Sequence, residues 1–122
     1  MERDLDLVRA IVLAIEAQPD GFAPGALPID GHTEEEIGYH VHIMIEAGLL
    51  HGQDITAINS RTPRSVATSL TWAGHEFADA AREEKRWMKA KHLVVTKAGS
   101  VTLDVLIKIL SSLTMSALGL RS

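Results

Sequence analysis

Six histidines are the side chains of this 122-residue sequence that could bind a metal ion or move a proton near neutral pH. His40 and His42 are two positions apart, so on a helix they point roughly 200° apart and cannot share one ion. His75 could approach His40 in space, where the pair could bind metal or hydrogen-bond with Glu76. Alternatively, both are partly buried structural histidines, bonded to each other or to a backbone carbonyl. The other three show no ligand spacing: His32, His51 and His92.

Other catalytic chemistry has little support in the sequence. It contains no cysteine, which excludes disulfides, thiolate zinc sites and cysteine nucleophiles. It also lacks a nucleophile elbow, a phosphate-binding glycine loop, an HExxH motif and a dinucleotide fingerprint. Glu34, Glu35 and Glu36 fan over roughly 200° on a helix, so they suit the positive end of the helix dipole better than a carboxylate pair. We therefore expect no enzymatic activity, no metal site and no cofactor.

Charge is distributed unevenly along the chain. The net charge is −4, which excludes a generally polybasic binder, and the aromatic content of 4% is too low for a platform that stacks single-stranded bases. Residues 1–60 contain two basic and eleven acidic residues, whereas residues 61–122 contain ten basic and five acidic ones. This asymmetry indicates either an acidic and a basic face with separate partners, or chance placement on a solvated surface.

The first half of the chain predicts two helices separated by a loop. Apolar residues recur at helical spacing over residues 4–17, at Leu5, Val8, Ile11, Val12 and Ile15. Residues 19–31 carry three prolines and three glycines and predict a loop, in which residues 26–29 can pair as an edge strand. Residues 33–47 predict a second helix, because Thr33 and Glu36 have capping-box spacing and Gly48 suits a left-handed C-terminal cap.

The second half predicts a hairpin followed by two helices. Strands are expected over residues 49–58 and 65–71, joined by a turn at residues 59–64. Thr71 caps a third helix that runs to about Ala90, residues 98–100 break the chain, and Thr102 caps the last helix. This order predicts a mainly α fold with a small β-hairpin (α+β), an abbreviated winged helix-turn-helix with C-terminal helices. We assign residues 1–91 to the winged-helix domain and 92–122 to a C-terminal apolar helix.

Four segments also carry a family resemblance: residues 1–9 (MERDLDLVR), 39–49 (YHVHIMIEAGL), 70–77 (LTWAGHEF) and 118–120 (LGL). Through them the chain resembles DUF2513, a family of small bacterial and phage proteins of unknown function. The LTWAGHEF segment is the most specific of the four. The resemblance implies a winged-helix-like fold and a phage or mobile-element setting, and it supplies no catalytic residues.

The helix over residues 33–47 has the position of a recognition helix but the wrong charge for DNA. Its predicted outward face has no Lys or Arg, and it presents Glu35, Tyr39, His42 and Glu46. Carboxylates there are repelled by phosphates, which argues against conventional reading of the major groove. The wing and the third helix could instead bind duplex DNA, mainly by contacts with the phosphate backbone of the DNA. The residues expected to do so are Arg61, Arg64, Arg82, Lys85, Arg86, Lys89 and Lys91, unless they are ordinary solvated side chains.

The last helix is apolar nearly all round, with leucines in a heptad pattern. A small winged helix can cover only one of its sides, so we expect a homodimer. The interface residues would be Leu103, Leu106, Leu110, Leu113 and Ala117. The alternative is that the helix folds wholly into its own domain.

Two functions follow as hypotheses. The first is a non-enzymatic bacterial or phage transcriptional regulator that binds duplex DNA through its basic wing. The second is a protein-interaction module whose acidic helix meets a basic partner, such as a host protein modulated by a phage. We expect a cytoplasmic protein without a membrane span, because Asp104 and Lys108 interrupt the most apolar stretch and the N-terminus is charged.

Overall fold

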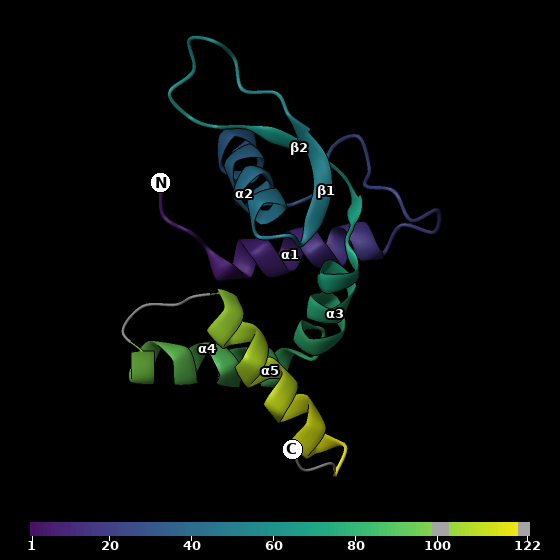
Figure 1. Ribbon diagram of the computed structural model, residues 1–122, viewed down its shortest axis with the longest axis vertical. Helices are drawn as coiled ribbons and strands as arrows, with labels where there is room; N and C mark the ends of the chain where they lie inside the picture. Colours follow the sequence, from purple (N-terminus) through teal and green to yellow (C-terminus); the bar gives the residue numbers. More distant parts are fainter. Residues whose placement is uncertain (99–102, 120–122) are drawn as a thin grey trace. The chain divides into compact units, whose positions relative to one another are not determined.

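The computed structural model describes residues 1–98 and 103–119, which form five helices and a two-stranded antiparallel sheet (Figure 1). The predicted mainly helical α+β fold is confirmed, and a winged-helix arrangement is compatible with it. The chain divides into two compact units, an N-terminal unit (Met1–Ala78) and a C-terminal unit (Asp79–Ser122). The predicted boundary at residue 91 lies inside a helix of the second unit. No helix of the described residues is long and apolar enough to cross a bilayer.

Helix α1 (Leu5–Glu16) begins at Asp4, whose carboxylate accepts hydrogen bonds from the backbone N–H groups of Asp6 and Leu7. This satisfies two of the donors that a helix start leaves unpaired. The buried stripe consists of Leu7, Val8, Ile11, Val12 and Ile15. The predicted helix is therefore confirmed, with Leu7 rather than Leu5 at the N-terminal end of its buried face.

Helix α2 (Glu34–Glu46) has the predicted capping box. The Glu36 N–H donates to Thr33 Oγ1 at 3.0 Å, and the Thr33 N–H donates to Glu36 Oε1 at 3.2 Å. Gly48 follows the helix with φ +82°, a conformation that a residue with a Cβ rarely adopts. The chain can therefore turn from α2 directly into the first strand.

Strand β1 (Leu50–Asp54) pairs with β2 (Ser65–Leu70), with a bulge between His51 and Gly52. The first strand is shorter than predicted, because the Asp54 carboxylate accepts from both the N–H and the hydroxyl of Thr56 and turns the chain away. The expected edge strand at residues 26–29 does not form. One loop residue reaches the sheet instead, since the Ala23 N–H donates to Thr68 O at 2.8 Å.

The single helix expected from Thr71 to about Ala90 is two helices, α3 (Trp72–Ala81) and α4 (Glu84–Ala98). The Glu83 carboxylate accepts from the Arg86 N–H at 2.7 Å, as a helix N-cap does. Arg and Glu are good helix formers, so residue propensity did not reveal this break. In the C-terminal unit α4 contacts α5 (Leu103–Ala117), and Trp87, Leu106 and Leu110 are buried.

Candidate interaction site on α2 and the hairpin

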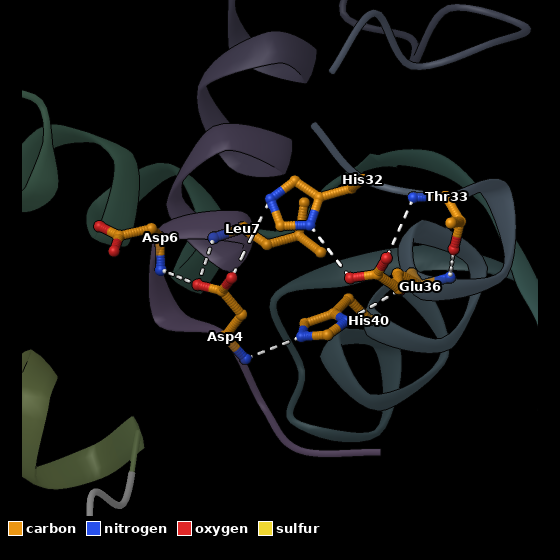
Figure 2. A network of polar contacts seen from close by, with 7 residues as sticks. All are labelled: Asp4, Asp6, Leu7, His32, Thr33, Glu36 and His40. Atoms are coloured by element: carbon orange, nitrogen blue, oxygen red, sulfur yellow. Dashed lines mark hydrogen bonds and ion pairs between the residues drawn. The ribbon is translucent and has the colours of Figure 1, made fainter. Parts of the chain in front are cut away.

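A polar network joins the start of α1 to the first half of α2 (Figure 2). At its centre His40 is 1% exposed, and its Nε2 accepts a 2.9 Å hydrogen bond from the Asp4 N–H. Its Nδ1 lies 2.8 Å from Glu36 O. Because the first partner can only donate and the second can only accept, the ring is neutral with its proton on Nδ1.

His32 closes the same network from the loop before α2. Its Nδ1 lies 3.2 Å from Glu36 Oε2, and its Nε2 lies 4.0 Å from Asp4 Oδ2. The Thr33 N–H, and then the hydrogen bond from His32, lower the pKa of the Glu36 carboxyl. The spacing of four positions between His32 and Glu36 was a local signal for the first contact, whereas the second partner, Asp4, lies far away along the chain.

The structure decides between the alternatives for the histidines. His75 is exposed on α3, whereas both ring nitrogens of His40 are engaged by backbone groups. His40 is therefore a structural residue and does not pair with His75. Within residues 1–98 and 103–119, no three His, Asp or Glu side chains are grouped closely enough to hold a metal ion.

The hairpin covers one side of α2 with polar contacts. His42 Nδ1 lies 2.9 Å from Oγ of the buried Ser65 in β2. The Thr62 hydroxyl donates to Glu35 Oε1 at 2.8 Å. Two of the four residues expected to face a partner thus contact the hairpin and its turn. Of the other two, Tyr39 is half-buried with its ring edge-on to His40, and Glu46 is exposed.

Arg64, one of the two wing arginines, folds back onto α2. Its stem lies so close to Gly38 that a Cβ added there would be 2.6 Å from Arg64 Cγ. Its guanidinium lies 3.8 Å from the Glu34 carboxylate. Both arginines are exposed, with 48% of the Arg64 side chain accessible, but Arg61 lies in the turn. The two wing arginines therefore do not form one projecting basic tip, and the role of Gly38 had no signal in the sequence.

A cavity of about 170 Å³ lies between the loop after α1, the first half of α2 and β2. Most of its lining is apolar, with Glu34 and Arg64 among the lining residues. The full lining consists of Pro24, Gly25, Ala26, Leu27, Glu34, Ile37, Gly38, Val41, Arg64, Ser65, Val66 and Ala67.

Comparison with known proteins places the chain in a family. The profile described as "Hypothetical protein (DUF2513)" matches residues 2–100. The chain belongs to the DUF2513 family. A relative described as an uncharacterised protein of Haemophilus influenzae (strain ATCC 51907 / DSM 11121 / KW20 / Rd) is 34% identical over 109 residues, which cover 87% of this chain and 89% of the relative. No solved structure matches.

The LTWAGHEF segment of this DUF2513 chain ties α3 to the end of α2. The Thr71 hydroxyl donates to Gly48 O at 2.5 Å and accepts from the Gly74 N–H at 3.0 Å. A Cβ on Gly74 would lie 2.2 Å from Leu49 O, so only glycine fits here without a shift. Trp72 is exposed, and its Nε1–H donates to Glu76 at 2.7 Å. The threonine and glycine of the motif thus have a packing role.

Several basic side chains expected to bind nucleic acid lie beside carboxylates in the C-terminal unit of the DUF2513 chain. Arg82 is 3.1 Å from Asp79, and Arg86 is 3.7 Å from Glu83. The ammonium of Lys91 lies 5.9 Å from the Trp87 ring centroid, a cation–π distance. The remaining two, Lys85 and Lys89, are exposed.

Helix α5 of the DUF2513 chain buries part of the surface expected to form a dimer. Leu106 and Leu110 are both 0% exposed within the single chain, and Leu113 is half-buried. The side chains of Leu103 and Ala117 lie outside the described part. The two most buried leucines are therefore already covered in the monomer.

Proposed function

We propose that this DUF2513 protein is a non-enzymatic binding module whose N-terminal unit recognises a basic protein surface. The N-terminal unit contains four basic and twelve acidic residues, a balance of −8. A charge of this size steers an oppositely charged partner and repels nucleic acid. The C-terminal unit has eight basic and four acidic residues, a balance of +4.

The contact of Arg64 with α2 carries the proposal. In a DNA-binding wing, arginines project toward phosphates. Here the stem of Arg64 packs on Gly38 and its guanidinium faces Glu34, while Glu35 and Glu46 remain exposed on α2. The helix therefore offers carboxylates, and one of the two wing cations faces the same helix.

The test is capture of partners from a nuclease-treated lysate of the native host by the full-length tagged protein. The Glu35→Gln/Glu46→Gln variant removes two charges from α2, and Glu2→Gln/Asp30→Asn removes two exposed charges elsewhere in the same unit. We expect the first variant to lose a partner that the second retains. Equal capture by both variants would contradict the proposal, since only overall charge would then matter.

Binding of duplex DNA is a second candidate, favoured by the exposure of Arg61, Lys85 and Lys89. Such binding would use mainly phosphate contacts and would weaken steeply with salt. Retention on heparin that falls with salt and is lost in Arg61→Ala would support it. No duplex binding even at low salt would exclude it.

A further inference from the structure

The outer edge of β2 can be assigned from the hydrogen-bond pattern of the hairpin. The Ile55 N–H donates to Arg64 O at 2.8 Å, and the register then pairs Gln53 with Val66 and Gly52 with Ala67. Antiparallel strands alternate between residues that bond to the neighbour and residues whose backbone groups point away. The N–H and C=O groups of Ser65 and Ala67 therefore point away from β1.

The described residues make few backbone hydrogen bonds to this edge, along which Ser65 is buried and Ala67 is half-buried. Among the described residues, Ala23 is the one loop residue with a backbone hydrogen bond to β2, at Thr68. The next residue, Pro24, has no N–H to continue the pairing. The loop leaves the sheet at that point, so the cavity lies where the expected strand at residues 26–29 would have paired.

The cavity has the size and lining for one apolar side chain. Ser65, Val66 and Ala67 of β2 form part of its wall. Its volume of about 170 Å³ is similar to that of an engineered apolar cavity of about 150 Å³ that binds benzene. An unpaired strand edge beside an apolar pocket is the arrangement that recognises extended peptides, because the edge supplies backbone bonds and the pocket supplies specificity.

The negative charge of the N-terminal unit favours extended peptides that carry basic residues. Glu34 and Arg64 both line the cavity and face each other at 3.8 Å, so the preference for a basic peptide comes from the neighbouring Glu35 and from the balance of −8 of the unit as a whole. We infer that β2 binds an extended segment of a partner protein in which basic and apolar residues alternate, one apolar side chain entering the cavity. This inference rests on the proposed function, because it names the form in which the basic partner binds.

The direct test uses a fluorescein-labelled peptide of alternating Lys and Val and the full-length protein. Two N-methylated versions carry methyl groups on either the odd-numbered or the even-numbered residues, so that each removes the N–H groups of one side of the strand. We expect one version to bind at least about tenfold more weakly by fluorescence anisotropy, the effect of losing one or two hydrogen bonds, and the other to bind as the parent does. Equal effects of both versions would overturn the inference.

The cavity is tested with two substitutions at one position. A Cβ on Gly25 meets no atom within 4 Å, so a side chain fits there without strain. Gly25→Phe introduces a ring at the cavity wall, whereas Gly25→Ser adds a small side chain. We expect about tenfold weaker binding of the peptide to the Phe variant and little change for the Ser variant. If both variants bind like the parent protein, no side chain enters the cavity, and the inference fails.

Further measurements separate this inference from the proposed function. If Glu35→Gln/Glu46→Gln abolishes peptide binding while the two methylated peptides behave alike, a basic partner binds α2 but not the strand edge. A peptide with Ser in place of Lys can also be compared with the Lys-Val peptide. If it binds as tightly and one methylated version still binds more weakly, the strand edge binds peptides, but the proposed preference for a basic partner is wrong. Slow hydrogen exchange at the Ser65 and Ala67 amides of the free protein would show that the edge is already occupied, which overturns the inference.

Discussion

The backbone N–H of Asp4 donates a 2.9 Å hydrogen bond to Nε2 of His40, a residue thirty-six positions later in the chain. The same Asp4 caps α1 with its carboxylate, and the same His40 bonds with its other nitrogen to the backbone of α2. One imidazole thus joins the N-terminal end of α1 to α2. Loss of this ring would leave the Asp4 N–H without its partner and a cavity at a buried position, whereas Glu36 O would keep its helical bond to the His40 N–H.

His40→Ala should therefore lower the free energy of unfolding by about 3 kcal/mol, from the lost volume and the unpaired Asp4 N–H together. Urea denaturation followed by circular dichroism measures this change. His75→Ala is the matched control, because His75 is exposed and such substitutions change stability by about 0.5 kcal/mol or less. Similar losses in the two variants would contradict a structural role for His40.

Gly74→Ala should be destabilising although alanine is the better helix former. The propensity gain is at most about 1 kcal/mol, while overpacking costs about 1–3 kcal/mol, here against the carbonyl oxygen of Leu49 at 2.2 Å. We expect a net loss of about 2 kcal/mol in urea denaturation. Gly25→Ala is the control, because a Cβ there meets open space. A Gly74→Ala protein as stable as the parent would disprove the close approach.

Glu36 should make the stability of the fold fall in acid. Its pKa is lowered from the ordinary value of 4.5, first by the Thr33 N–H and then by the hydrogen bond from His32. Glu36 therefore binds a proton more readily in the unfolded chain than in the folded one. The stability contributed by the ionised Glu36 carboxylate is complete above pH 4.5 and is lost as the pH falls through the lowered pKa of the folded state.

Glu36→Gln isolates this contribution, because glutamine keeps the capping-box acceptor and removes the charge. The difference in stability between the parent and the variant, measured by urea denaturation from pH 7 to pH 2.5, should shrink as the pH falls. The pKa values of Asp54 and Glu83 are also lowered by hydrogen bonds, so both proteins will still lose stability in acid. A difference that is constant over the range would refute the role of Glu36.

The two wing arginines should contribute unequally to binding of a polyanion. Both are exposed, but Arg64 also lies against Gly38 and near Glu34. On a heparin column Arg61→Ala should elute at lower salt than Arg64→Ala. Glu34→Gln should raise retention more than Glu2→Gln, which makes the same change in net charge without freeing Arg64. Elution of both arginine variants at the same salt concentration would show that Arg64 is equally available.

Local sequence signals predicted the elements of the N-terminal unit well. The periodicity of α1, the capping box of Thr33 and Glu36, and the glycine after α2 all appear in the structure as expected. Each of these signals acts between residues a few positions apart. The break between α3 and α4 was missed because the Glu83 cap lies among residues that also favour a continuous helix.

The sequence by itself determined the helices α1 and α2, the hairpin after them, the acidic character of α2 and the absence of cysteine chemistry. Only the tertiary structure decided which side chains of α2 and the hairpin meet: Arg64 lies on Gly38, and His42 contacts Ser65. It also left the β2 edge beside a cavity in place of the expected third strand. The physical reason is that helix caps and hydrophobic periodicity are local, whereas these contacts join segments brought together only when the core packs.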